Sequence, residues 1–404
     1  MPPPPGLPSV DAYDLVAPGT VLFGPGRFGE LGALVRRFGR RAWLVTGTRS
    51  LAACGGRAAV EEALVAAGLE PAVVALSRGE PTVADVAEAL ASLPASGRDE
   101  AVVVAIGGGA AIDLGKALAA LATNVPVGAV DFEQQVIDRL EGVGLGLAID
   151  VPPLPVVAVP TTAGTGAEAT RNAVISCPHR RLKKSMRSPL MVPRAAIVDP
   201  ALTRSCDRMV TASSGLDCIT QLVESFVCRR RAVIPRALVL DALPRAMAAL
   251  PRALVEPDDL DARASMSHAA FISGMALANS GLGMAHGVAA ALGVECGAPH
   301  GLACATMLPV ALRVNRTACR DDFALLERAC DPHAAGDAET AADAFIARVD
   351  ALCGVAGTPR RLADLGVDRS RIGWLAANSG GASMRGNPVE LSADDLLGIL
   401  ERAY

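Results

Sequence analysis

Short apolar runs alternate with helical stretches over the first 200 residues, and this alternation restricts the chain to few folds. Five such runs are rich in Val, Ala, Leu and Ile, and they almost vanish beyond Pro200. The runs cover residues 41–47, 71–77, 101–109, 154–162 and 195–200. Strands that alternate with helices are typical of βαβ units with a mostly parallel sheet. We therefore predict an α/β domain over residues 1–200.

Beyond Pro200, long Ala- and Leu-rich stretches with helical periodicity continue to the C-terminus. A chain of 404 residues is long for one core, so two domains are expected. We predict an all-helical domain over residues 201–404. The active site is expected in the cleft between the two domains, where ligand sites commonly lie.

The composition narrows the range of partners. A formal net charge of -4, with acidic and basic residues mixed along the chain, offers no basic face for nucleic acid or anionic lipid. No apolar run reaches the roughly 20 residues of a spanning helix, and the start MPPPPGLPSV lacks the features of a signal peptide. Ten cysteines without a CxxC pair favour free thiols in a reducing compartment. We expect a cytoplasmic protein with a small-molecule partner, and neither a nucleic-acid nor a membrane partner.

A glycine-rich turn follows the most apolar run. The sequence AVVVAIGGGAAIDLGK leads from residue 101 into Gly107, Gly108 and Gly109, and then into a helix that carries Asp113 and Lys116. Glycines let backbone amides approach a pyrophosphate, and a helix N-terminus adds donors and a favourable dipole. A tight turn without a ligand is the alternative.

A second loop strengthens the nucleotide interpretation. The sequence VPTTAGTGAEAT, residues 159–170, also leaves an apolar strand, and it offers Thr161, Thr162 and Thr165 to a polar ligand. Two loops of this kind favour a dinucleotide.

The end of the second strand bears on the choice between NAD and NADP. An acidic residue there would bind the ribose 2'-hydroxyl of NAD, but Gly47 occupies the position and no carboxylate follows until Glu61. Arg49 follows close behind and can pair with the 2'-phosphate of NADP. NADP is therefore slightly favoured over NAD, the alternative being that Arg49 is simply exposed.

The segment SSGLDCITQLVESF, residues 213–226, reads as a buried helix with two polar side chains on one face. Asp217 and Gln221 are four residues apart, so the helical period of 3.6 points both at one object. A polar pair that satisfies a neighbouring helix end is the alternative. Downstream, one glycine-rich segment holds His286 and His300, two of the five histidines. The other three, which we expect to be structural or exposed, are His179, His268 and His333.

The two glycine-containing loops together resemble those of the group III, or iron-containing, alcohol dehydrogenase family, whose members carry GGGSxxDxAK and TTAGTGSE sequences. Here the loops read GGGAAIDLGK and TTAGTGAE, with Ala110 and Ala167 in the serine positions. The resemblance extends to residues 80–82, 196–203 and 386–404, so it spans nearly the whole chain. It implies a dehydroquinate synthase-like α/β domain, an NAD(P)-dependent alcohol dehydrogenase or aldehyde reductase, and a homodimer or larger homo-oligomer.

The resemblance also implies a divalent metal. In the family an aspartate, a histidine four residues on and two further histidines hold it. Asp217, His286 and His300 match as metal ligands and catalytic residues. Gln221 occupies the second position, and we expect it to face the metal as a ligand as well. An amide is a weaker donor than imidazole, so Fe²⁺ and Zn²⁺ stay open, with a metal-free site as a lesser alternative. The family often has another histidine, for which this chain has Ala290.

The implied reaction is hydride transfer between a nicotinamide cofactor and an alcohol, aldehyde or ketone, with the metal polarising the oxygen. Alternatives are a dehydroquinate synthase, a maleylacetate reductase, a hydroxyacid-oxoacid transhydrogenase, or a non-catalytic cofactor-binding homologue. Two further predictions concern the fold: residues 13–26 supply strands to the sheet, and the basic cluster 180–187 is a solvated face. In the alternative for that cluster, Lys183 or Lys184 reaches the cleft.

Overall fold

Six parallel strands organise the first half of the chain. The computed structural model describes residues 12–94, 97–126 and 128–404. The strand order is β1-β8-β5-β4-β2-β3, and each neighbouring pair is parallel. The strands are β1 (Thr20–Phe23), β2 (Arg41–Gly47), β3 (Glu70–Ser77), β4 (Ala101–Gly107), β5 (Val156–Pro160) and β8 (Ala195–Val198).

Two hydrophobic clusters lie on opposite faces of this sheet, because alternate residues of a strand point to opposite sides. Val103 of β4 packs with α4 and α5, whereas Val102 and Val104 pack with α1 and α3. An inner strand of a parallel sheet is buried on both faces in this way. The helices of this half are α1 (Leu31–Val35), α2 (Ser50–Ala53), α3 (Arg57–Ala66), α4 (Val83–Ala91), α5 (Gly109–Asn124) and α6 (Phe132–Ile137).

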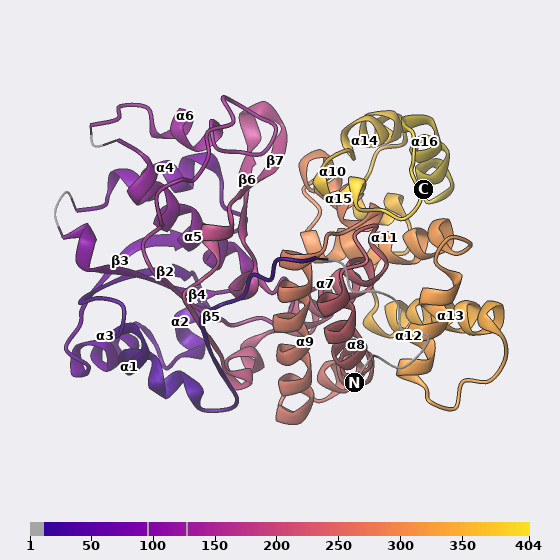
Figure 1. The fold of residues 1–404 in the computed structure, drawn as a ribbon, viewed down its shortest axis with the longest axis horizontal. Coiled ribbons are helices and arrows are strands. Elements are labelled where there is room, and N and C mark those ends of the chain that lie inside the picture. Colours follow the sequence, from indigo (N-terminus) through magenta and orange to yellow (C-terminus); the bar gives the residue numbers. More distant parts are fainter. Residues whose placement is uncertain (1–11, 95–96, 127) are drawn as a thin grey trace.

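The second half of the chain is helical and packs around α7. The buried residues of α7 form one cluster with those of α8, α9, α11, α12 and α13. Figure 1 shows this half beside the sheet. Its helices are α7 (Arg208–Val227), α8 (Val233–Val255), α9 (Leu260–Asn279), α10 (Met284–Cys296), α11 (His300–Asn315), α12 (Arg320–Cys330), α13 (Ala338–Ala356), α14 (Ile372–Asn378), α15 (Ala382–Arg385) and α16 (Ala393–Arg402).

The structure confirms the predicted fold class. Each of the five apolar runs coincides with one of the parallel strands to within a few residues, and α-helices follow from residue 208 onward. β8 ends at Val198 and α7 begins at Arg208, so the change of texture in the sequence coincides with a change of architecture. The division into domains at residue 200 stays a prediction.

A two-stranded hairpin differs from the sequence prediction. Within residues 180–187, predicted as a solvated face, β7 (Leu182–Arg187) pairs antiparallel with β6 (Asn172–Cys177). Lys183 and Lys184 of β7 line the cleft described below, which is the alternative that the sequence left open. Charged residues indicate contact with water, and both a cleft and an outer surface provide it, so the pattern alone does not separate the two.

The segment before β1 joins the two halves. Residues 13–26 include β1, so this segment supplies a strand to the sheet as predicted, and that strand pairs with β8 of the same chain. Val16 N donates to Asn279 Oδ1 at 2.7 Å, and Asn279 Nδ2 donates to Val16 O at 2.8 Å. Figure 1 shows this indigo segment running from the helical half to the sheet.

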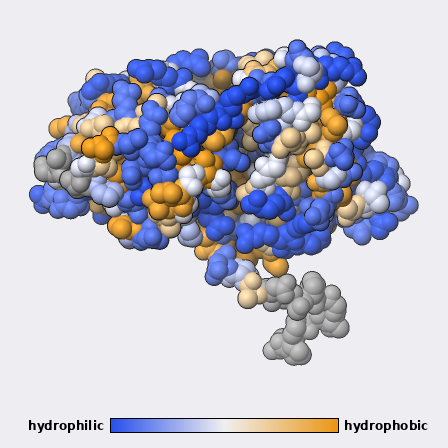
Figure 2. Space-filling view, turned by 90° about the horizontal axis from the view of Figure 1, so that it is seen from above, coloured by the Kyte–Doolittle hydropathy of each residue, from blue (hydrophilic) through white to orange (hydrophobic). Residues whose placement is uncertain are grey.

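The surface is mixed in character. Figure 2 shows a face where hydrophilic side chains dominate and hydrophobic patches are scattered among them.

Within the described ranges, no single helix has the length and apolar composition needed to cross a membrane. Among the described helices, only α9 and α10 taken together have that length and composition, and the pair is bent by 99°.

Lys116 fixes the start of β6 against α5 from inside the α/β half. Its ammonium donates to Ala167 O at 2.9 Å and to Thr170 Oγ1 at 2.7 Å. It also donates to Asn172 O, and the Asp113 carboxylate lies 2.9 Å away. A buried charge is tolerated here because it is paired and hydrogen-bonded.

Replacing Lys116 tests how much this buried cation contributes to stability. We expect Lys116→Met to lower the free energy of unfolding by about 3–5 kcal/mol, because the substitution leaves Asp113 without its cation. Urea denaturation measures the change. Arg57→Met is the control, since Arg57 forms an exposed ion pair with Glu61 whose loss costs about 1 kcal/mol or less. Equal effects of the two substitutions would contradict the structural role of Lys116.

Candidate active site

The carboxyl ends of β2, β4 and β5 lie side by side at one edge of the sheet. Thr161 N, just after β5, donates to Gly107 O at the end of β4 at 2.9 Å. The winding direction reverses between β2 and β4, because β3 lies outside β2 while β5 lies outside β4. Ligands of open α/β sheets bind beyond the carboxyl ends of the strands at such a point.

Glycine is required at this edge for steric reasons. Gly107 has a φ of 156°, and a Cβ there would lie 2.7 Å from Ala111 Cβ and 2.8 Å from Ser50 Oγ. A Cβ on Gly109, the first residue of α5, would lie 2.5 Å from Thr165 Oγ1. The chain therefore passes closely between neighbouring elements, and the amides at the start of α5 face the space beyond the strands.

Other residues predicted to bind the cofactor meet at the same edge. Gly47 ends β2, and its nitrogen would lie 3.3 Å from a Cβ on Gly107. Thr162 Oγ1 would lie 3.4 Å from a Cβ on Gly108. Arg49 is exposed at the start of α2, and its side chain forms no hydrogen bond or ion pair with the described residues.

Asp113 and Lys116 occupy different positions, although the sequence prediction grouped them. Asp113 lines the cleft and accepts a hydrogen bond from Val174 N at 3.0 Å. Lys116 lies behind it and is 1% exposed, so its ammonium does not reach the cleft surface. Lys116 therefore acts on this edge by holding the loop and strand described above.

Three polar side chains occupy one face of α7. Asp217, Gln221 and Glu224 follow one another at i, i+4 and i+7, which places them on the same side of the helix. All three are buried, while apolar residues such as Leu216 and Phe226 pack into the helical core. This face of α7 therefore turns toward something other than the core.

Gln221 connects α7 to the loop after β5. Its Nε2 donates to Thr165 O at 3.0 Å and to Ser273 Oγ of α9 at 2.8 Å. A carbonyl oxygen only accepts, so the amide nitrogen must face this loop and Oε1 must face away from it. The same loop contacts α9 through Gly166 and Gly274, where a Cβ on Gly274 would lie 2.1 Å from Gly166 O.

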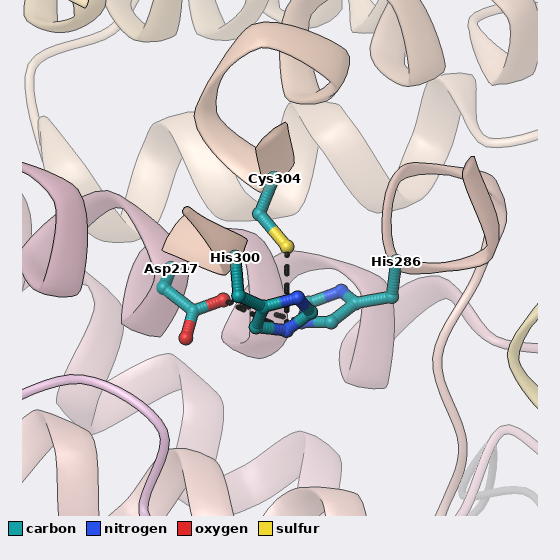
Figure 3. Close-up of side chains that lie close together, drawn as sticks. All are labelled: Asp217, His286, His300 and Cys304. Carbon is teal, nitrogen blue, oxygen red and sulfur yellow. Dashed lines mark hydrogen bonds and ion pairs between the residues drawn. The ribbon is translucent and has the colours of Figure 1, made fainter. Parts of the chain in front are cut away.

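His286 and His300 approach Asp217 from α10 and α11. His286 Nε2 lies 3.4 Å from Asp217 Oδ1, and His300 Nε2 lies 3.8 Å from the same oxygen. Cys304, one turn after His300, places Sγ 3.7 Å from His300 Nε2. Figure 3 shows the four side chains converging, and one donor atom from each lies within 4.8 Å of the others.

Glu224 orients His286 from behind. Its Oε2 accepts a hydrogen bond from His286 Nδ1 at 2.7 Å, and its Oε1 accepts one from Ala285 N at 2.6 Å. This contact keeps a proton on Nδ1, so Nε2 is the ring nitrogen that faces Asp217 and that would bind a metal on losing its proton. Burial would lower the pKa of His286, but Cys304 and the two carboxylates outweigh it and raise this pKa well above its usual value.

The other groups of the cluster also shift one another's protonation. Burial alone would raise the pKa of Asp217, but the imidazoles of His300 and His286 outweigh it and hold this pKa at about 2. Burial, followed by the charge of Lys183, lowers the pKa of His300 to about 4. At pH 7 Asp217 is therefore ionised, and His300 is neutral with a lone pair to offer.

The cluster contains buried polar atoms without hydrogen bonds, which is what a metal site requires. Among the residues that the structure describes, Asp217 Oδ1 and His286 Nε2 are buried and have no hydrogen-bond partner. Such atoms are unfavourable unless a ligand satisfies them. A carboxylate, two imidazoles and a thiol are donors that divalent transition metals accept, so these residues fit a metal ion.

One cleft of about 590 Å³ joins this cluster to the cofactor edge. Its volume is in the range of sites for small molecules and cofactors. Ala290 also lines it, at the position where the resembled family often has a further histidine. The predicted site residues that line the cleft are Gly109, Asp113, Thr165, Asp217, Gln221, His286 and His300.

Glu224 and Cys304 belong to the cluster but are absent from the sequence prediction. Both carried a signal, because Glu224 follows Asp217 by seven residues and Cys304 follows His300 by four, which are helical spacings. A cysteine among apolar residues usually fills space in a core, so its spacing alone does not separate packing from ligation.

Comparisons with known proteins give a consistent result. A family model described as iron-containing alcohol dehydrogenase matches residues 18–200, and one described as its C-terminal part matches residues 211–404. Lactaldehyde reductase of Escherichia coli (strain K12) is 31% identical over 387 residues, which are 95% of this chain and 98% of that protein.

Two solved structures share the architecture. A 1,3-propanediol oxidoreductase is 27% identical with a TM-score of 0.86, over 98% of this chain and 100% of that one. A sulfoacetaldehyde reductase from Bifidobacterium kashiwanohense, solved in complex with NAD⁺, is 26% identical with a TM-score of 0.80, over 97% of this chain and 99% of that one.

Replacing Glu224 tests its effect on the cluster. We expect Glu224→Gln to weaken the affinity for Zn²⁺ about 10- to 100-fold, because a carboxylate behind a ligating imidazole orients it and raises its basicity. Competition with a chromophoric chelator measures the affinity. Glu327→Gln is the matched control, since Glu327 is equally buried but pairs with Arg348 on α13. Unchanged Zn²⁺ affinity in Glu224→Gln would rule out the orienting role.

Proposed function

The chain belongs to the iron-containing alcohol dehydrogenase family, and we propose that it is a metal-dependent oxidoreductase. It transfers a hydride between a nicotinamide cofactor and an alcohol, aldehyde or ketone. One observation carries this proposal: the glycine-rich edge of the sheet and the buried cluster of Asp217, His286 and His300 open into one cleft. The activities named for lactaldehyde reductase and 1,3-propanediol oxidoreductase support the same reaction class.

The two parts of the chain have separate tasks in this proposal. Residues 1–200 form the dinucleotide-binding domain, and residues 201–404 form the metal and substrate domain. The amides at the start of α5 bind the pyrophosphate, because a helix N-terminus favours an anion. The contacts proposed for the cofactor come from Gly47, Arg49, Gly107, Gly108, Gly109, Asp113, Thr161, Thr162 and Thr165, with Lys116 supporting them from behind.

Asp217, His286 and His300 hold one divalent metal, Fe²⁺ or Zn²⁺. Support comes from their convergence and from the buried atoms that lack hydrogen bonds. Gln221 Oε1 and Cys304 Sγ are the candidates for a further donor, and a thiolate would favour zinc. When bound, the metal supplies a Lewis acid that polarises the substrate oxygen.

The chain's own side chains shape the space around the reacting carbon. Leu277 and Leu282 line the cleft with the cluster, and apolar walls displace water and strengthen the electrostatic interactions inside. Ala290 has no exchangeable proton, so this position does not relay one. Asp217, with a pKa of about 2, accepts no proton near neutral pH.

We also propose that the protein acts in the cytoplasm as a homodimer or larger homo-oligomer. All ten cysteines are free, which suits a reducing compartment. β1 forms one edge of the sheet, and such an edge readily pairs with a second chain.

Metal removal tests the proposed function. We expect protein purified without chelator to hold about one zinc or iron per chain, and to oxidise NADH or NADPH with short aldehydes. Stripping the metal abolishes turnover and adding it back restores turnover. Elemental mass spectrometry and the absorbance of reduced nicotinamide give the two readings.

Paired histidine variants show whether the loss comes from the cluster. His286→Ala is expected to lose metal and turnover while it still binds the cofactor, whereas His333→Ala, outside the cluster, keeps both. Full turnover by metal-free protein would defeat the proposal. Cofactor binding without turnover by the metal-loaded protein would point to a non-catalytic homologue.

Arg49 tests the cofactor preference. We propose that NADP is favoured, so kcat/KM is expected to be higher with NADPH than with NADH. Arg49→Gln should lower the ratio of these two values about 10-fold or more, because a charge-assisted hydrogen bond to phosphate contributes about 1.5–3 kcal/mol. Arg57→Gln on the neighbouring α3 is the control. A ratio that does not change in Arg49→Gln means that Arg49 is an exposed residue without this role.

A further inference from the structure

An arginine cluster, formed by Arg171, Arg187 and Arg230, lines the cleft that also contains Asp217 and His286. Arg171 precedes β6 and Arg187 ends β7, whereas Arg230 lies in the loop between α7 and α8. Two of the three arginines come from the α/β half and one comes from the helical half. The cluster therefore forms where the two halves meet.

The charges of Arg187 and Arg230 both act on Arg171, and all three residues line the same cleft. Burial lowers the pKa of Arg171, and the charges of Arg187 and Arg230 lower it further. Glu141 acts in the opposite direction, and its Oε2 lies 3.5 Å from Arg187 Nη2. Three positive charges therefore face one negative charge, so the cluster keeps a net positive charge.

Arg171 and Arg230 keep hydrogen-bond donors for a ligand. Arg171 Nε is buried and has no hydrogen-bond partner among the described residues. Arg230 Nη1 donates to Ser280 O at 2.9 Å, and its other donors have no partner among the residues that the structure describes. A buried donor without an acceptor, such as Arg171 Nε, is unfavourable, and like charges gathered in one place are too. An anion between these arginines relieves both conditions, because a guanidinium binds carboxylate or phosphate oxygens in pairs.

The arginine cluster lies at a distance from the metal-ligand cluster. Asp217 precedes the end of α7 by ten residues, a separation of roughly 15 Å along the helix toward Arg230. Along β7, Arg187 lies four residues beyond Lys183, whose charge acts on His300, and this is roughly 13 Å. The two separations are similar. A substrate that reaches both clusters therefore has its anionic group several bonds away from its carbonyl group.

The arginine cluster is also separate from the proposed pyrophosphate site. Val174 N bonds Asp113 in the first turns of α5, and Asn172 O contacts Lys116 one turn later. Arg171 continues in this direction, away from the helix N-terminus. The amides at the start of α5 and the arginine cluster are therefore two different places for an anion.

We propose that the substrate is an aldehyde or ketone, or the matching alcohol, that ends in a carboxylate, sulfonate or phosphate bound by Arg171, Arg187 and Arg230. The inference rests on the proposed oxidoreductase function and names its substrate class. The chain between the two ends of the substrate lies along Leu277 and Leu282. Hydride from reduced nicotinamide adds to the carbonyl carbon and a proton adds to the oxygen, which gives the alcohol and oxidised nicotinamide.

A chain-length series tests this substrate class. The probes are ω-oxo carboxylates, from glyoxylate through succinic semialdehyde to longer homologues, each paired with the n-alkanal of equal carbon number. We expect kcat/KM for the oxo acid to exceed that for the alkanal in the longer pairs, and not in the glyoxylate pair, where the charge adjoins the carbonyl. Aldehydes of matched length that end in sulfonate or phosphate show which anion is preferred.

Arginine variants locate the effect. In Arg171→Gln and in Arg230→Gln, the ratio of oxo-acid to alkanal kcat/KM is expected to fall about 10- to 100-fold. In Arg171→Lys this ratio should fall less, because lysine keeps the positive charge and loses only the paired donors of the guanidinium. Arg204→Gln is the control, since Arg204 pairs with exposed Asp258 away from the cleft, and the ratio should not change.

The outcomes separate this inference from the proposed function. Turnover of alkanals with no advantage for any of the three anions overturns the inference and leaves the function standing. An advantage that survives in both glutamine variants overturns the placement at the arginines. A higher KM for reduced cofactor with an unchanged substrate ratio assigns the arginines to the cofactor and overturns it as well.

A binding measurement decides the inference without turnover. Calorimetry should show that 4-hydroxybutyrate binds the cofactor-loaded protein more tightly than 1-butanol does, and that Arg171→Gln removes the difference. If neither substrate class is turned over, the oxidoreductase proposal fails. Equal binding of the two alcohols would then also defeat the anion site.

Discussion

Backbone contact between Gly166 and Gly274 holds the two sides of the cleft in register. Gly166 has a φ of 60°, and a Cβ there would lie 2.4 Å from Ala270 O, so a side chain would separate the loop after β5 from α9. Gln221 holds the same loop to α7 through Thr165 O. The distance between the cofactor edge and the metal-ligand cluster is therefore set by close backbone packing, which changes little with side-chain motion.

The cleft has two ends with opposite electrostatic needs. At one end, the buried atoms Asp217 Oδ1 and His286 Nε2 have no hydrogen-bond partner among the described residues, and a metal cation can satisfy both. At the other end, crowded guanidinium groups such as Arg171 favour an anion. Without a ligand, the unpaired polar atoms and the crowded guanidinium groups both lower the stability of the fold. Unsatisfied groups of this kind are expected at functional sites. A substrate with an uncharged carbonyl and a distant negative charge binds such a cleft in one orientation.

The sequence by itself determined the elements and the chemistry of the site. The run 101–109 contains β4, because a strand buried on both faces consists almost entirely of apolar residues and is read from composition alone. The glycines after β4 follow from the sharp turn between a strand and a helix. Asp217 and Gln221 share a face because helical spacing is a local property of the chain. The spacing of His300 and Cys304 carries the same information.

Only the tertiary structure decided which of these groups meet. Lys116 turns inward because carbonyl groups of the loop after β5, far along the chain, enclose its ammonium. Glu224 becomes the partner of His286 across 62 residues, and no local pattern indicates such a contact. Arg171 and Arg230 converge for the same reason, since they come from different halves of the chain. Local sequence specifies backbone conformation and side-chain chemistry, whereas burial, charge and protonation depend on neighbours that only the packing of distant segments supplies.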